Sequence, residues 1–222
     1  MKYAIVVAGG SGTRMQSALP KQFLLLKGKP ILMHTLQRFY DADPGTNIIL
    51  VLPESQKAYW QEVCVKHDFK IDYAIVAGGE TRFHSVKNGL AMINGGEGVV
   101  AIHDGVRPLV SKALINKCFE TALEYKAVVP AVVPTESLRQ VTGATSKAVD
   151  RADFRNIQTP QCFTTDLLKQ AYKKEYIPAF TDDATVVEAV GQAITLVEGE
   201  PANIKITNPQ DLLLAELLID SI

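Results

Sequence analysis

The chain has 222 residues, and its 23 basic and 24 acidic side chains give a formal net charge of −1. This balance argues against general binding of nucleic acid, which needs a strongly basic surface. Hydrophobic residues make up 47% of the chain, yet no uncharged apolar run approaches the roughly 20 residues of a membrane helix, so we expect neither nucleic acid nor a membrane as a partner.

Short apolar strands alternate with amphipathic helical stretches through the first 133 residues. Strands are expected at residues 3–8, 47–52, 72–76, 98–103 and 127–133. Helices are expected after Pro30, over residues 54–67, from a Thr81 cap to Ile93 and from a Ser111 cap to Tyr125. This order predicts an α/β fold with a mostly parallel sheet that is covered by helices on both faces.

The pattern changes beyond residue 133. Residues 137–154 contain a Gly143-Ala144 turn flanked by alternating polar and apolar residues, which predicts a β-hairpin arm. Further elements follow it: a strand near 157–163, helices near 165–175 and 182–190, strands at 194–197 and 203–207, and a closing helix at 209–219. Because we find no repeat or linker, we expect one domain over residues 1–222 with an arm at about 137–156.

Cysteine usage and the first residues favour a cytoplasmic protein. Cys64, Cys118 and Cys162 are odd in number and widely spaced, which indicates neither a disulfide framework nor a zinc site. The apolar stretch at residues 4–8 is too short for the core of a secretory signal.

In open parallel sheets, ligands bind beyond the carboxyl ends of the strands. The loop after the first strand reads Ala8-Gly9-Gly10-Ser11-Gly12-Thr13-Arg14-Met15, and Lys21 follows it. Its glycines let backbone N–H groups approach an anion, and Arg14 and Lys21 can close on that anion. The dinucleotide pattern fails, since Met15 stands at its third glycine position. The loop predicts an anion site; the alternative is a structural turn beside surface basic residues.

A second glycine turn precedes the Thr81 cap and reads Gly78-Gly79-Glu80-Thr81-Arg82-Phe83-His84-Ser85. Its backbone can hydrogen-bond a base edge, and Ser85 can reach a ribose or a base. Taken alone, a tight turn followed by a helix cap explains the same residues.

The segment His103-Asp104-Gly105-Val106-Arg107-Pro108 ends the fourth strand. Asp104 and Arg107, three residues apart, can form a mutually satisfied pair. A carboxylate in this place can instead bind magnesium-held water or a substrate hydroxyl. We interpret His103 as a structural residue.

Three later positions carry weaker signals. Lys205 lies within an apolar strand pattern, so it needs an anionic partner if it faces inward; a solvent-facing lysine is the alternative. Thr181 and the two aspartates after it can be a helix cap. Arg151 follows the arm.

Taken together, these motifs resemble the 2-C-methyl-D-erythritol 4-phosphate cytidylyltransferase family of the non-mevalonate isoprenoid pathway, over essentially the whole chain. Besides the three glycine and aspartate segments above, the resemblance rests on Pro20-Lys21-Gln22, Val149-Asp150-Arg151, Gln158-Thr159-Pro160-Gln161, Thr181-Asp182-Asp183 and residues 198–207. Glu80, Gly105 and Ser137 differ from the residues that are usual in the family.

The resemblance implies a Rossmann-like nucleotidyltransferase fold and a homodimer with embracing arms. It implies transfer of CMP from CTP to methylerythritol phosphate. To neutralise the phosphate charge of this reaction we expect magnesium, or another divalent cation, as the cofactor. The matching catalytic positions are Arg14, Lys21, Arg151 and Lys205, with Arg151 reaching in from the neighbouring subunit. The matching nucleotide-binding positions are Ala8, Gly9, Gly10, Gly12, Gly79, Glu80 and Ser85. The matching alcohol-phosphate positions are Asp104, Gly105, Arg107, Ser137 and Thr181.

The chemistry agrees with these roles. The nucleophile is a phosphate oxygen that is ionised near neutral pH, since its second pKa is about 6, so no general base is required. We expect magnesium to be held mainly by the triphosphate, with Asp104 as a contact through water, and name no direct metal ligand. Ribitol 5-phosphate is the alternative acceptor. A sugar-nucleotide pyrophosphorylase is disfavoured because such chains are commonly longer. A non-catalytic nucleotide-binding protein is disfavoured because Arg14, Lys21 and Lys205 are all present.

Overall fold

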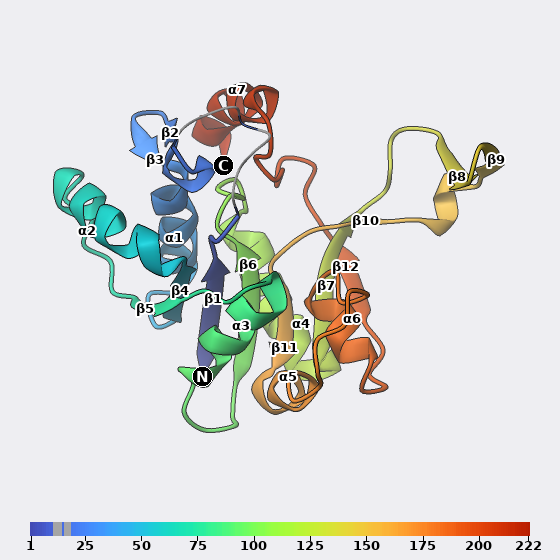
Figure 1. The fold of residues 1–222 in the computed structure, drawn as a ribbon, viewed down its shortest axis with the longest axis horizontal. Helices are drawn as coiled ribbons and strands as arrows, with labels where there is room; N and C mark the ends of the chain where they lie inside the picture. Colours follow the sequence, from blue (N-terminus) through green and yellow to red (C-terminus); the bar gives the residue numbers. More distant parts are fainter. Residues whose placement is uncertain (11–14, 16–18) are drawn as a thin grey trace.

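The computed structural model describes residues 1–10, 15 and 19–222, and within them the central sheet has eight strands (Figure 1). Seven strands follow the order β10 (Asn156–Ile157), β7 (Ala127–Val132), β11 (Gln161–Thr164), β6 (Val99–Asp104), β1 (Lys2–Val7), β4 (Asn47–Leu52) and β5 (Ala74–Ala77), and β12 (Thr195–Glu198) also pairs with β7. The pairs β1–β4, β1–β6, β4–β5 and β7–β12 are parallel, whereas β10 and β11 run antiparallel to their neighbours. The predicted mostly parallel sheet is confirmed.

Alternate side chains of the buried strands face opposite sides of the sheet and form two apolar layers. On β1, Ala4 and Val6 pack on one side and Tyr3 and Ile5 on the other. The first layer is covered by α1 (Ile31–Ala42), α2 (Lys57–Lys66) and α4 (Lys112–Tyr125). The second layer is covered by α3 (Arg82–Ala91), α5 (Thr165–Ala171) and α6 (Asp183–Glu188).

A third apolar cluster lies at the carboxyl edge of the sheet. There α7 (Pro209–Leu218) packs Ala215 against Ile206, Leu109 and Leu26. Figure 1 shows this helix beyond the tip of β1, together with the short pair β2 (Leu25–Leu26) and β3 (Lys29–Pro30). The same edge therefore gathers segments from both ends of the chain.

Local capping signals set the starts of several helices. Thr81 Oγ1 accepts a hydrogen bond from the backbone N–H of His84, and Ser111 Oγ accepts one from that of Leu114, so both predicted caps are confirmed. The predicted helix at 54–67 begins as a 3₁₀ turn, η3 (Glu54–Gln56), before α2.

Two strand predictions need correction. The strand expected near 157–163 is divided into β10 and β11, because Pro160 between them has no N–H to donate to the ladder. The strand expected at 203–207 is wrong: these residues are irregular. Asn203 N–H bonds to Glu200 and Ile204 N–H to Ala202 in local turns, and Ile206 N–H donates to Val106.

The predicted arm is a hairpin of β8 (Leu138–Thr142) and β9 (Thr145–Val149), followed by the 3₁₀ turn η4 (Arg151–Asp153). Gly143 supplies the positive φ of +58° in the two-residue loop. Figure 1 shows the hairpin standing well away from the sheet. Among the described residues, no helix is long and apolar enough to cross a membrane.

Candidate active site

A pocket of about 400 Å³ opens at the carboxyl edge of the sheet, beside the ends of β1, β4, β5 and β6. Its lining comes from segments that are far apart in the chain: Val7, Ala8, Gly9, Gly10, Lys21, Gln22, Pro53, Glu54, Gly78, Gly79, Glu80, Thr81, Arg82, Ser85, Asp104, Val106 and Lys205. The parallel strands bring these loops together, as expected for a ligand site in this type of sheet.

The first wall of the pocket joins the glycine loop to the 3₁₀ turn η2 (Lys21–Phe23). Gln22 is almost fully buried, and its Nε2 donates to Ala8 O at 2.8 Å and to Gln56 Oε1 at 2.7 Å. Lys21 is 9% exposed, and its Nζ donates to Ile206 O at 3.3 Å. The side chain of Gln22 thus ties η2 to two neighbouring segments, and the bond to Ile206 O holds the Lys21 ammonium at the pocket.

The second wall is the glycine turn before α3. Gly79 N–H donates to Ser85 Oγ at 3.1 Å, which fixes the hydroxyl at the start of the helix. A Cβ on Gly79 would lie 2.4 Å from His84 Cβ, so only glycine fits this approach. Glu80 and Ser85 therefore both line the pocket, and Gly79, which precedes them, contributes only backbone atoms.

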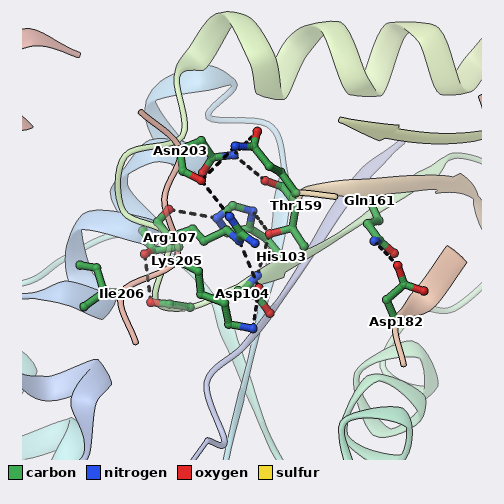
Figure 2. A network of polar contacts seen from close by, with 12 residues as sticks. His103, Asp104, Arg107, Thr159, Gln161, Asp182, Asn203, Lys205 and Ile206 are labelled. Atoms are coloured by element: carbon green, nitrogen blue, oxygen red, sulfur yellow. Dashed lines mark hydrogen bonds and ion pairs between the residues drawn. The ribbon is translucent and has the colours of Figure 1, made fainter. Parts of the chain in front are cut away.

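Asp104, at the end of β6, is surrounded by three cations, of which Figure 2 shows Arg107 and Lys205. Its carboxylate lies 3.0 Å from Lys205 Nζ, 3.2 Å from Arg107 Nε and 3.8 Å from Arg82 Nε. Burial raises the pKa of Asp104, but the attraction of Arg82, Lys205 and Arg107 outweighs it and holds that pKa well below the usual range. Asp104 is therefore a carboxylate at any pH near neutrality.

A neutral histidine lies behind that carboxylate. His103 is fully buried, which lowers its pKa to about 4. The Arg107 carbonyl, 3.1 Å from Nε2, can only accept, so Nε2 carries the proton and Nδ1 accepts from Thr159 Oγ1 at 3.0 Å. Thr159 Oγ1 in turn accepts the backbone N–H of Asp104 at 3.2 Å. The structural role that we predicted for His103 is thus to fix both ends of the 104–107 loop.

The same network, visible in Figure 2, anchors the segment that carries Lys205. Asn203 Nδ2 donates to Thr159 O at 2.9 Å, and Arg107 Nη1 donates to Asn203 O at 2.8 Å. Lys205 therefore projects from an anchored segment and pairs with Asp104, although 41% of its side chain stays exposed. Of the two alternatives that the sequence left open, the anionic partner is present, but the lysine is not buried.

The structure brings most of the predicted positions to one pocket. These are Ala8, Gly9, Gly10, Lys21, Gly79, Glu80, Ser85, Asp104 and Lys205. Gly12 and Arg14 lie outside the described residues.

Five predicted positions lie apart from that lining: Gly105, Arg107, Ser137, Arg151 and Thr181. Arg107 stands behind Asp104 and holds it in place. A Cβ on Gly105 would lie 2.8 Å from Ala8 Cβ, so this glycine lets the loop after β6 pack on β1. Thr181 is exposed beside the start of α6, and Ser137 and Arg151 are exposed at the base of the arm, where Arg151 Nη1 donates to Thr135 O.

Several lining residues were not assigned a role from the sequence. Gln22 and Arg82 stand within the quoted motifs, yet nothing local distinguishes them from structural residues. Pro53 and Glu54 follow β4, so the rule that polar residues after strand ends mark a site would have found Glu54.

A mostly parallel sheet with a glycine loop and converging cations at its carboxyl edge defines a nucleotidyltransferase of Rossmann-like fold. A family model described as 2-C-methyl-D-erythritol 4-phosphate cytidylyltransferase matches residues 2–221. The cytidylyltransferase of that name from Bacteroides fragilis is 55% identical and covers 97% of this chain and 98% of its own. The chain therefore belongs to the 2-C-methyl-D-erythritol 4-phosphate cytidylyltransferase family.

Solved structures agree in fold. The crystal structure of 2-C-methyl-D-erythritol 4-phosphate cytidylyltransferase from Thermus thermophilus has a TM-score of 0.79 at 32% identity, covering 99% of this chain and 100% of its own. The crystal structure of 4-diphosphocytidyl-2C-methyl-D-erythritol synthase from Anaerococcus prevotii has a TM-score of 0.82 at 27% identity, covering 98% and 97%.

Proposed function

We propose that the pocket around Lys21, Asp104 and Lys205 is where this chain performs the reaction of its family. The protein is a cytidylyltransferase that transfers CMP from CTP to 2-C-methyl-D-erythritol 4-phosphate and releases pyrophosphate, in isoprenoid biosynthesis. The observation that carries the assignment of the site is the meeting of Lys21 and Lys205, 184 positions apart, with two glycine turns at one pocket.

In this scheme an ionised oxygen of the alcohol phosphate attacks the α-phosphorus of CTP. A new P–O bond forms, the bond between the α- and β-phosphates breaks, and its electron pair leaves on pyrophosphate. Negative charge grows on the α-phosphate and on the leaving group, so positioned cations are the catalytic requirement. We assign Lys21 and the predicted Arg14 to the stabilisation of this charge.

Other residues hold the reactants in line. The backbone of Gly9, Gly10 and Gly79 and the hydroxyl of Ser85 are assigned to CTP. Asp104 and Lys205 are assigned to the alcohol phosphate, with Arg107 keeping the Asp104 carboxylate in place.

Magnesium is part of the proposal and fits the donors present. No group of three or more histidine, cysteine or acidic side chains that could hold a metal occurs among residues 1–10, 15 and 19–222. Asp104 is already engaged with three cations, which suits a contact through water more than direct ligation. Magnesium commonly binds through phosphate oxygens, waters and one or two carboxylates, and here it would neutralise triphosphate charge.

We also propose a homodimer in which the arms are exchanged. An isolated two-stranded hairpin is marginal in water, and this one stands away from its own sheet (Figure 1). Apolar side chains are exposed on and near it: Val133, Val141, Phe154, Ile157 and Leu196. A partner that covers them supports both the arm and a role for Arg151 in the neighbouring site.

The reaction is tested with CTP, magnesium and either methylerythritol phosphate or ribitol 5-phosphate. We expect pyrophosphate release with the former and little with the latter; a large preference for ribitol phosphate would contradict the acceptor. Cell fractionation tests the expected cytoplasmic location.

The shared site is tested by mixing subunits that carry Lys21→Met with subunits that carry Arg151→Ala. If each site takes its arginine from the partner, one site of each mixed dimer is intact and activity returns. The absence of recovery in verified mixed dimers contradicts the exchanged-arm arrangement.

A further inference from the structure

A buried ion pair on the pocket wall is not used in the scheme above. Arg82 is the first residue of α3 and lines the pocket. Its Nη2 donates to Asp183 Oδ2 at 2.7 Å, and the Asp183 side chain is 0% exposed. The pair joins the start of α3 to the start of α6.

Asp183 is held from its other side by a tyrosine. Tyr172 is 3% exposed, and its hydroxyl donates to Asp183 Oδ1 at 2.6 Å. Both carboxylate oxygens are therefore engaged, one by Arg82 and one by Tyr172. The neighbouring Asp182 is fixed in turn by Gln161, whose Nε2 donates to Asp182 Oδ2 at 2.8 Å (Figure 2).

The guanidinium of Arg82 keeps donors for a ligand. Asp183 uses one of its five N–H groups. Within the part of the chain that the structure describes, the only other acidic partner of Arg82 is Asp104, at 3.8 Å, beyond hydrogen-bond distance. The Arg82 side chain is 29% exposed and faces the pocket, so its remaining donors are accessible from there.

A purely structural pair is the competing explanation. Such a pair adds little net stability, because the desolvation of two charges offsets their attraction. An arginine that is anchored at one edge and open to a pocket is instead suited to recognise phosphate, since its planar fork is already oriented.

We propose that Arg82 binds a phosphate oxygen of the alcohol substrate, and that Asp183 and Tyr172 are positioning residues that hold its guanidinium. This inference rests on the proposed function. The alcohol side is favoured over CTP because Arg82 lies between Asp104, which is assigned to the alcohol phosphate, and Asp183, which follows two residues after Thr181, a position that the resemblance assigns to the same substrate.

The test compares the wild type with Arg82→Lys, Asp183→Asn and Tyr172→Phe. Each is assayed for kcat and KM with methylerythritol phosphate, for CTP affinity by calorimetry, and for melting temperature. Tyr176→Phe is the matched control: its ring also packs on Phe83, but it is partly exposed and makes no described bond to Asp183.

We expect KM for methylerythritol phosphate to rise on the order of tenfold or more in Arg82→Lys and Asp183→Asn, and less in Tyr172→Phe, as for the loss of hydrogen bonds to a charged group. CTP affinity should change less than about threefold, and Tyr176→Phe should match the wild type in all three measurements.

Two outcomes overturn the proposal. A lower melting temperature with unchanged kinetics makes the pair structural, and an equal loss of CTP affinity assigns Arg82 to the nucleotide. If Asp183→Asn does not fold, Tyr172→Phe and Arg82→Lys still decide between these results. If the wild type shows no turnover, the proposed function is contradicted. The role of Arg82 is then tested by measuring the affinity of the same variants for methylerythritol phosphate by calorimetry.

Discussion

Replacing Lys21 by methionine isolates the effect of one charge in the proposed reaction. Methionine retains an unbranched apolar stem, which suits a side chain that is only 9% exposed, but it lacks the ammonium. Since η2 and the bond to Ile206 O already hold Lys21 at the pocket, little reorganisation is needed when charge develops on the phosphates.

The expected size follows from electrostatics. A unit charge about 4 Å from the ammonium, at an effective dielectric constant of about 20, interacts by about 4 kcal/mol. That corresponds to about a thousandfold in rate, and loss of one positioned donor in other enzymes costs a hundredfold to a thousandfold, roughly 3–4 kcal/mol. Because the triphosphate is charged before it reacts, part of this attraction acts on the ground state. We therefore expect kcat to fall about a hundredfold or more and KM for CTP to rise less than about fivefold.

The assay is the initial rate of pyrophosphate release over a series of CTP concentrations at saturating methylerythritol phosphate. Lys29→Met is the control, since Lys29 is an exposed lysine outside this pocket and should react like the wild type. A Lys21→Met variant whose kcat stays within threefold of the wild type, or whose loss lies wholly in KM, refutes the proposed role.

Three further predictions concern stability and the metal. Burial lowers the pKa of His103 to about 4, compared with about 6.5 in an unfolded chain. The neutral imidazole therefore contributes fully to the free energy of unfolding above about pH 6.5, and this contribution is lost as the pH falls toward 4. The expected loss in the free energy of unfolding is about 3 kcal/mol. His103→Gln should flatten the dependence of this free energy on pH, as measured by urea titrations at several pH values; an unchanged dependence contradicts the role of His103. Thr159→Val leaves the Asp104 N–H and His103 Nδ1 without their partner and should lower the free energy of unfolding by about 1–3 kcal/mol, whereas an unchanged urea midpoint would show that the network is dispensable. A chelator should abolish turnover and magnesium restore it, and full activity in the chelator alone contradicts the proposed cofactor.

The sequence predicted the parts of the fold that local spacing controls. Thr81 and Ser111 cap helices where their side chains meet free backbone N–H groups a few residues on, and the buried strands appear as apolar runs. The turn at Gly79 could also be predicted from the sequence. Glycine is required there because a Cβ on residue 79 would lie too close to His84 Cβ.

Local pattern failed where a distant partner decides the conformation. The apolar pattern at residues 203–207 predicts a strand. The backbone N–H groups of this segment instead donate within local turns and, at Ile206, to the carbonyl of Val106 in another loop. Likewise Arg82 and Asp183 each look like ordinary helix starts, and their pairing across 101 positions exists only in the folded chain.

By itself, then, the order of residues determined the alternation of strands and helices, the projecting hairpin and the family. Each of these follows from side-chain periodicity, turn chemistry or motifs a few residues long. The tertiary structure alone decided which charged groups lie close together. Lys205 pairs with Asp104, Lys21 lines the same pocket, and Arg82 lies between the carboxylates of Asp104 and Asp183. Strand order and loop paths set those distances, and the energy of a charge depends on its partners in space rather than on its neighbours in sequence.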